Sequence, residues 1–289
     1  MSERLEVRKT HKLAIGGTFV RSESGRSYPV TDAKGRFVAN AAQASRKDVR
    51  DSVAAARKAF AGWSSAAAYH RGQVLYRVAE MMEGRRSQLV DEVAAGEGLT
   101  RRRAEAAVDA AVDRWVWYAG WPDKLAQVLG SANPVAGPYY DFSVPEPTGV
   151  VAVLAPQRSS LLGLVSVVAP VIVSGNTCVV VAAERQPLPA VTLAEVLATS
   201  DVPGGVVNVL TGLTGELAPW LASHRDVNAL DLAGADPTHA TDLQRAAADT
   251  LKRVLAPAGG GEPDWSDDPG TSRMRHFLET KTVWHPIGR

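Results

Sequence analysis

Five short apolar runs alternate with helical patterns in the second half of the chain, and this alternation constrains the fold most strongly. The first run, residues 150–154, reads Val-Val-Ala-Val-Leu and is typical of a strand that is buried on both faces. The other runs that we expect to be strands are residues 177–181, 206–210, 227–232 and 252–255. The helical patterns between them span residues 159–174, 188–199, 216–222 and 237–250. This order predicts an α/β fold with a doubly wound parallel sheet, whose ligands sit at the carboxyl ends of the strands.

The region before residue 149 is expected to be mainly helical. Ser45 is followed three residues later by Asp48, as in a capping box, and apolar residues then recur at helical spacing. A second helix is expected to carry the apolar positions of residues 74–93. A third runs over residues 101–121, where Pro122 bends or ends it. The sequence therefore predicts a helical N-terminal region in front of the sheet.

The balance of charged and apolar residues excludes several kinds of partner. The chain has 289 residues, 45% of them hydrophobic, and a net charge of +1, so no overall field favours nucleic acid or an acidic membrane. Three consecutive arginines, residues 101–103, lie beside Glu105 and Asp109, which is typical of a solvated helix face. The longest apolar run, residues 161–173, contains Pro170 and is too short to span a bilayer. We therefore expect no nucleic-acid partner and no membrane partner.

Two features indicate the compartment. The single cysteine, Cys178, excludes an internal disulfide and suits a reducing environment. The start of the chain, residues 1–12, is charged throughout and lacks the apolar core of a secretory signal. A cytoplasmic location is expected on these grounds.

The predicted strand ends carry no recognised catalytic motif. The first strand leads into Ala155-Pro156-Gln157-Arg158, which lacks the Gly-x-Gly-x-x-Gly turn of dinucleotide-binding folds. Gly212, Gly215 and Gly234 follow the third and fourth strands as isolated glycines, which are most often tight bends or helix caps. The six histidines have no ligand spacing, so no metal site is predicted. The serines at 159–160 lack the surroundings of a nucleophile elbow.

A series of motifs along the chain resembles those of one enzyme family. Residues 146–151 read Glu-Pro-Thr-Gly-Val-Val and resemble the family motif EPVGVV, and residues 203–212 resemble PPGVVNVVTG. Similar matches occur at residues 13–20, 30–35, 117–124, 175–177 and 223–227. The family is the aldehyde dehydrogenase superfamily. The resemblance runs in order from residue 13 to about residue 263 and resumes at residues 278–288.

The resemblance implies a division of the chain into three parts. Residues 1–125 and 149–262 would form a domain of the NAD-binding type. Residues 126–148 and 275–289 would form an oligomerisation arm, which consists of a β-hairpin and a terminal strand. Residues 263–274 would be a linker in the place of the family's entire catalytic domain, which is absent.

Only part of the family's cofactor pocket is matched. The residues that match cofactor-binding positions are Pro156, Glu184, Gly212 and Gly234. The resemblance implies that Glu184 holds the adenosine ribose, but Val181 takes the place of the lysine that shares this task. Ala235 takes the place of a serine that contacts the pyrophosphate, and Asp236 adds an anion that would repel phosphate at a helix N-terminus. We therefore expect no cofactor, with NAD in a degraded pocket as the alternative.

The residues that aldehyde oxidation requires are missing from the matched part. Arg158 stands where the family has the asparagine that stabilises the oxyanion, and Pro257 stands where it has the general-base glutamate. Cys178 lies inside a predicted strand, where a buried thiol behaves as a small apolar group. Acyl transfer needs a nucleophile within reach of a base, and loss of an oxyanion donor slows it further. We therefore predict no catalytic residues and a pseudoenzyme-like protein.

The retained arm indicates assembly with another chain. The hairpin is expected over residues 125–144, and the terminal strand is expected to end on Trp284, where His285 and Pro286 stop it. The residues expected to mediate assembly are Tyr140, Phe142, Val144, Leu278, Thr280, Thr282, Val283 and Trp284. In the family this arm pairs with the catalytic-domain sheet of a neighbour, and an unpaired edge strand needs to be covered. The expected partner is a full-length aldehyde dehydrogenase in a hetero-oligomer, or a second copy in a homodimer. Alternatively, the terminal strand packs back on its own hairpin.

Three classes of function stay open. The leading one is a non-catalytic subunit that stabilises or regulates a full-length NAD(P)-dependent aldehyde dehydrogenase. The second is a module that binds NAD(P) or another phosphate ligand, with Arg158 as an anion contact, although an exposed surface arginine explains Arg158 equally simply. The third is a residual NAD-dependent aldehyde oxidoreductase, for which the sequence offers no nucleophile.

Overall fold

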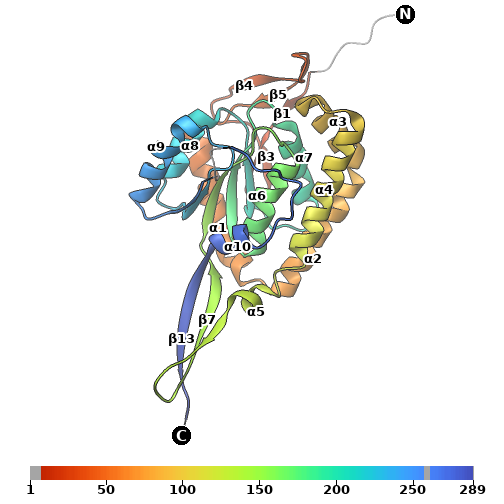
Figure 1. Ribbon diagram of the computed structural model, residues 1–289. Coiled ribbons are helices and arrows are strands. Elements are labelled where there is room, and N and C mark those ends of the chain that lie inside the picture. Colours follow the sequence, from red (N-terminus) through yellow and green to blue (C-terminus); the bar gives the residue numbers. More distant parts are fainter. Residues whose placement is uncertain (1–7, 257–260, 289) are drawn as a thin grey trace, which may run out of the picture.

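A seven-stranded sheet forms the centre of the molecule (Figure 1). The computed structural model describes residues 8–256 and 261–288. The strand order is β12 (Arg253–Leu255), β11 (Ala229–Asp231), β8 (Val150–Leu154), β9 (Thr177–Val181), β10 (Val207–Leu210), β2 (Leu13–Ile15) and β3 (Thr18–Val20). The strands from β12 to β10 are parallel, and the β2–β3 hairpin joins β10 in antiparallel orientation. The predicted doubly wound sheet is confirmed, and its chain order reverses between β8 and β11.

Helices cover both faces of this sheet because its central strands are apolar on both faces. Every residue of β8 and β9 is buried. One face of β8 packs in a cluster with α6 (Leu162–Val173) and α7 (Leu188–Ala198). The opposite face packs with α1 (Arg46–Ser65), α8 (Thr214–Ser223) and α9 (Pro237–Ala248). The predicted alternation of strands and helices after residue 149 is therefore correct.

The N-terminal helices begin as predicted but divide differently. The Ser45 side chain accepts hydrogen bonds from the backbone of Asp48, whose carboxylate accepts the Ser45 N–H at 2.7 Å, so the capping box is present. The single helix expected over residues 74–93 is wrong. Two helices, α2 (Ala68–Gly84) and α3 (Arg86–Glu97), meet at Arg85, which has φ −110° and ψ 13° and interrupts the helical path. The third predicted helix is α4 (Arg101–Ala119).

The expectation of a mainly helical N-terminal region missed a group of short strands. Besides β2 and β3, residues before α1 form β1 (Thr10–His11), β4 (Ser27–Thr31) and β5 (Phe37–Ala42). These three strands make a separate sheet in the order β1-β5-β4. The strands are two to six residues long and acquire partners only through tertiary contacts, so their local sequence gave little periodic signal.

A narrow sheet projects from the body at the residues predicted to form an arm (Figure 1). Its strands are β6 (Ser131–Asn133), β7 (Tyr139–Pro147) and β13 (Leu278–Pro286), in the order β13-β7-β6. The predicted hairpin started too early, because residues 125–129 form the short helix α5 (Leu125–Leu129). The terminal strand does not end on Trp284 but continues to Pro286, where it still pairs with Tyr139. β13 therefore pairs along its whole length with the chain's own hairpin, which was the alternative interpretation.

The connecting segment, residues 261–277, joins the main sheet to the arm and is packed onto the body. Trp265, Met274 and Phe277 are buried in the same cluster as α4 and α6. Arg114 of α4 donates hydrogen bonds to the carbonyl oxygens of Trp265 at 2.8 Å and Asp267 at 2.9 Å. The segment includes the helix α10 (Ser272–His276), which contacts α6. The predicted linker thus contributes side chains to the core.

Candidate functional site

A cleft of about 740 Å³ lies at the carboxyl ends of the parallel strands, between α8 and α9. We refer to it as the strand-end cleft. Its apolar lining includes Leu154, Ala218, Pro219, Leu243 and Ala246. Its polar lining includes Gln157, Arg158, Glu184, Thr214, Asp236, His239, Asp242 and Glu262. A crevice where strand order reverses is the usual ligand position in such sheets.

Glu184 follows β9 and lies against the N-terminus of α8. Its Oε1 accepts a hydrogen bond from the backbone N–H of Thr214 at 2.5 Å. Its own backbone N–H donates to Oε1 of Gln157 at 3.0 Å. A carboxylate is stabilised at a helix N-terminus by free N–H groups and the helix dipole. The residue predicted to hold a ribose is therefore already engaged, through one carboxylate oxygen, within the chain.

Of the other predicted cofactor-binding residues, one lines the strand-end cleft and two do not. Gly234 lines the cleft, and a Cβ there would lie 1.8 Å from the carbonyl oxygen of Ala155, so only glycine fits this turn. Gly212 has a φ of +145°, but its neighbours are Ala44 and other residues outside the cleft lining. Pro156 packs towards α6 and also lies outside the lining. Glu184 and Gly234 are thus brought together, and Gly212 and Pro156 are not.

Asp236 caps the N-terminus of α9 on the opposite wall of the cleft. Its Oδ1 accepts hydrogen bonds from the backbone N–H of Thr238 at 2.9 Å and from the Thr238 hydroxyl at 2.7 Å. These bonds to the Thr238 side chain and backbone hold the pKa of Asp236 below its usual value. The helix terminus that could attract an external anion therefore carries an ionised carboxylate of its own.

Glu262 is a cleft residue that sequence reasoning missed. Its Oε1 accepts the backbone N–H groups of Gln157 at 2.5 Å and Arg158 at 3.0 Å, just beyond the end of β8. The Trp265 indole N–H donates to its other oxygen at 3.4 Å. The only signal in the sequence was an acidic residue after a run of glycines, because the contact depends on how the connecting segment folds back.

The strand-end cleft is predominantly acidic. Glu184, Asp236, Asp242 and Glu262 contribute four carboxylates, whereas Arg158 is the one arginine or lysine among the cleft-lining residues that the structure describes. The Arg158 side chain is exposed, and its backbone N–H is already bonded to Glu262. Low-dielectric walls strengthen the field of such like charges, so the cleft disfavours anions.

Comparison with known proteins identifies the family. Residues 19–264 match the sequence model described as "Aldehyde dehydrogenase family". The chain belongs to the aldehyde dehydrogenase family. It is 32% identical over 260 residues to benzaldehyde dehydrogenase, mitochondrial, of Antirrhinum majus, and the match covers 87% of this chain and 47% of that protein. It is 31% identical over 265 residues to human retinal dehydrogenase 2, with coverage of 90% and 50%.

Solved structures of the family share the fold. HpcC from Thermus thermophilus superposes with a TM-score of 0.79 at 31% identity, and the match covers 85% of this chain and 47% of that chain. The NAD+ complex of aldehyde dehydrogenase from Bacillus cereus superposes with a TM-score of 0.79 at 25% identity, with coverage of 85% and 50%. The chain spans about half the length of the relatives that it matches.

The single cysteine of the chain lies in the interior of the main sheet. Cys178 is completely buried in β9, and burial raises the pKa of its thiol. Such a thiol is neither ionised nor accessible at neutral pH. Pro257, which the resemblance aligns with the general base, lies outside the described residues. Within residues 8–256 and 261–288, no group of three or more His, Cys, Asp or Glu side chains is placed to hold a metal ion.

Among the described residues, no helix has both the length and the apolar character needed to cross a bilayer.

The sheet of the arm has two faces, and the residues predicted to mediate assembly are distributed over both of them. Phe142 lies opposite Val283 and Val144 lies opposite Lys281, so these side chains share a face with Tyr140, two residues before Phe142. We call the part formed by Tyr140, Phe142, Val144 and Val283 the apolar face of the arm. The ion pair of Lys281 with Glu146, at 2.9 Å, lies at the end of this face nearer the body. The Tyr140 and Phe142 rings stack on it with centroids 5.4 Å apart.

The opposite face of the arm mixes polar side chains with the aromatic pair Tyr139 and Trp284. The Ser143 and Thr282 hydroxyls are 2.9 Å apart, and Asn133 donates to Asp141 at 2.9 Å. The alternating pattern of β13 places Leu278, Thr280 and Trp284 on this same face. The eight predicted residues therefore do not form a single surface.

Proposed function

We propose that this chain is a non-catalytic aldehyde dehydrogenase subunit that assembles with a full-length, NAD(P)-dependent family member and stabilises or regulates it. The observation that carries the proposal is the apolar face of the arm. Tyr140 is 52% exposed at the far end of this face, although it stacks on Phe142. Val144 and Val283 are only half-buried. An apolar strip on a projecting sheet is the kind of surface that a partner chain covers.

The outer edge of β13 supports the same proposal. In the sheet order β13-β7-β6, β13 has β7 on one side and, within the described residues, no strand on the other. An edge strand of nine residues offers a row of backbone groups for pairing with another sheet. The resemblance to the family implies that this other sheet belongs to the catalytic domain of a neighbour. A full-length relative can supply such a domain, and a second copy in a homodimer is the competing partner.

The non-catalytic part of the proposal rests on Cys178. The mechanism of the family requires an exposed, activated nucleophile, and this thiol lies in the middle of the sheet, enclosed in an apolar cluster. We propose a cytoplasmic location because a single free thiol suits a reducing compartment.

The dinucleotide cofactor of the family fits the strand-end cleft poorly. The apolar walls and Glu184 suit a nucleoside, but the N-terminus of α9 holds the Asp236 carboxylate where a diphosphate would require donors. The Glu262 carboxylate similarly accepts hydrogen bonds from the backbone N–H groups of Gln157 and Arg158, so these donors are already occupied. Two like charges at these positions would repel each phosphate. We therefore infer that the chain works without NAD, and a phosphate-binding module with Arg158 as anion contact is the less favoured alternative.

An activity assay tests this function. The chain alone should produce no aldehyde-dependent NADH, because it lacks a usable nucleophile. Added to a full-length aldehyde dehydrogenase from the same host, it should change that enzyme's rate or thermal inactivation half-life. A double variant, Tyr140→Ser with Val283→Ser, should lose this effect, while Tyr139→Ser on the opposite face should keep it. Aldehyde oxidation by the pure chain would contradict the proposal.

A further inference from the structure

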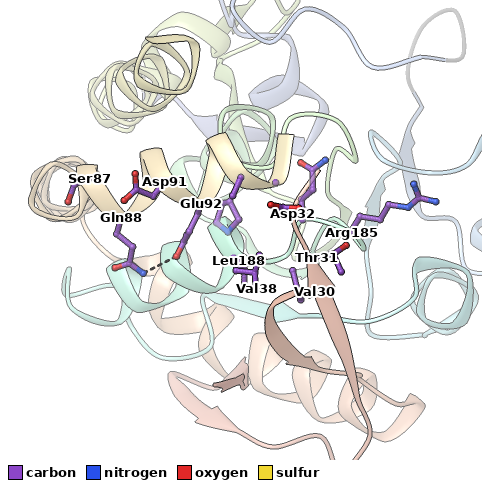
Figure 2. Close-up of a pocket in the computed structure, with 14 residues that line it drawn as sticks. Val30, Thr31, Asp32, Val38, Ser87, Gln88, Asp91, Glu92, Arg185 and Leu188 are labelled. Atoms are coloured by element: carbon purple, nitrogen blue, oxygen red, sulfur yellow. Dashed lines mark hydrogen bonds between the residues drawn. The ribbon is translucent and has the colours of Figure 1, made fainter. Parts of the chain in front are cut away.

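A second cavity, of about 540 Å³, lies away from the strand-end cleft and shares none of its lining residues. It opens to solvent and is bordered by β4 and β5, by α3, and by the loop that starts α7 (Figure 2). Its apolar lining consists of Val30, Val38, Ala95, Leu188 and Pro189. Its size is that of an ordinary small-molecule site.

One end of this cavity carries a half-satisfied carboxylate. Oε1 of Glu92 accepts hydrogen bonds from Gln88 Nε2 at 2.9 Å and from the Thr192 hydroxyl at 2.8 Å. Oε2 of Glu92 is buried and has no hydrogen-bond partner among the described residues. A buried acceptor without a donor costs free energy unless something supplies the donor.

A second acceptor lies in the same lining. Oε1 of Gln186 is also buried and without a hydrogen-bond partner in the part of the chain that the structure describes. Gln186 comes from the loop before α7, and its side chain lies against Gly96 of α3, one helical turn after Glu92. Both missing partners are donors, which specifies the polar group that a ligand would have to bring.

The other charged residues of the lining are not available for this role. Asp32 is used by the turn after β4, where it accepts the backbone N–H groups of Lys34 and Arg36, each at 2.9 Å. Asp91 is exposed and forms an ion pair with Arg101 at 3.1 Å. In Figure 2 the guanidinium of Arg185 points away from Glu92. Glu92 and Gln186 are therefore the lining residues that can define the ligand.

We propose that this cavity binds a small organic amine, with its ammonium group between Glu92 and Gln186 and its apolar body against Val30, Val38 and Leu188. An ammonium group supplies three donors and the charge that a buried carboxylate lacks. A metal ion is a poorer occupant because the unpartnered side-chain oxygens of the described lining are two, in a mainly apolar cavity, and no cluster of His, Cys, Asp or Glu able to hold a metal is found among the described residues. An anion would be repelled by Glu92.

The nearest competing cation belongs to the chain itself. Lys9 and Glu195 are the charged groups whose fields act on Glu92 from neighbouring elements, Lys9 from just before β1 and Glu195 from α7. Lys9 is exposed, and Glu195 is paired with Arg85. The test must therefore separate an external amine from the Lys9 ammonium.

Calorimetric titration with three probes of the same shape tests the proposal. Phenethylamine should bind the purified chain, and 3-phenylpropionate should bind at least about tenfold more weakly because it loses a charge-assisted hydrogen bond and gains repulsion. The neutral 3-phenylpropanol should lie between them. Glu92→Gln should reduce this preference for the amine over the alcohol, and Gln186→Leu should weaken amine binding. Asp113→Asn, an exposed substitution on α4 outside the cavity lining, should leave amine binding unchanged.

Three results would overturn the proposal. The first is no heat or thermal shift with millimolar phenethylamine in a folded protein. The second is equal affinity for the amine and the carboxylate. The third is amine binding that appears only in Lys9→Met, which would make Lys9 the natural occupant. Glu92→Gln and Gln186→Leu nearly preserve side-chain size, so both variants are expected to fold. A melting curve for each variant checks this.

Discussion

The carboxylate of Asp231, completely buried at the end of β11, forms an ion pair with Arg273 of α10. Arg273 also lies over the Trp265 ring, with its guanidinium carbon 5.1 Å from the ring centroid. The pair joins the strand ends to the connecting segment, at the point where the resemblance implies that a catalytic domain has been replaced. The main sheet and the arm are therefore linked by a structured and partly buried segment.

Removing Arg273 tests this link. Arg273→Met would leave the Asp231 carboxylate buried and unpaired, which should lower the free energy of unfolding by about 3–5 kcal/mol. Arg275→Met, on the exposed side of the same helix, is the matched control and should change it by less than about 0.5 kcal/mol. Urea unfolding followed by tryptophan fluorescence measures both. Equal stability of the two variants would show that the pair does not hold the segment.

Arg114 should hold the same segment from α4. Arg114→Met removes the donors to the carbonyl oxygens of Trp265 and Asp267, which should cost about 1–3 kcal/mol. The loop of residues 261–271 should also become more sensitive to limited proteolysis. Arg102→Met, an exposed substitution in the same helix, serves as the control. The idea fails if proteolysis in the loop is as slow in Arg114→Met as in the control.

The Cys178 thiol should be inert in the folded protein. It is fully buried in β9, and burial raises its pKa, so neither access nor ionisation favours reaction. Ellman's reagent should label no thiol under native conditions and one thiol per chain in denaturant. Rapid native labelling would contradict the account of this residue and reopen the question of a nucleophile.

Stability should depend on pH through Glu92. Burial raises the pKa of this carboxyl above its usual 4.5, so the folded state holds the proton more tightly than the unfolded state. Its contribution to stability is present below pH 4.5 and is lost as the pH rises through the folded-state pKa. Glu92→Gln cannot titrate at this position. As the pH rises from 4.5 through the folded-state pKa, the natural protein should therefore lose stability relative to the variant. The melting temperatures of both proteins, measured from pH 4 upward, test this. A difference in melting temperature that does not change with pH would refute it.

The parts of the fold that the sequence predicted are those with a local signal. The strand of residues 177–181 was predicted at its observed ends, because a run of β-branched residues between two turns is unambiguous. The break at Arg85 was missed because apolar spacing continues across it from Met82 to Leu89. Gly84 ends α2 directly before the bend, but an isolated glycine inside a helical pattern is not by itself a stop signal.

The candidate sites depended on contacts that no local pattern encodes. Glu184 was identified because it closes a recognisable motif, but its hydrogen bond to Thr214 joins residues 30 positions apart. Glu262 meets the backbone of Gln157 from 105 positions away. The missing donors around Glu92 become visible only when α3 and the start of α7 are seen together.

The two faces of the arm should contribute unequally to assembly. Tyr140→Ser removes the most exposed aromatic ring of the apolar face, whereas Tyr139→Ser removes a ring from the opposite face, where it contacts Trp284. Loss of a buried interface aromatic costs about 2 kcal/mol or more, so Tyr140→Ser should weaken the complex by at least about thirtyfold. Surface plasmon resonance against the purified partner compares the two. Equal weakening by both variants would mean that the apolar face is not the contact surface.

The most direct test of the subunit role is the native mass and composition of the complex formed in the host. The chain is tagged, purified gently and analysed by size-exclusion chromatography with light scattering and mass spectrometry. The account predicts a defined hetero-oligomer that contains a full-length aldehyde dehydrogenase, and that dissociates when Tyr140 and Val283 are both replaced by serine. A stable monomer, or a homodimer without a catalytic partner, would contradict it.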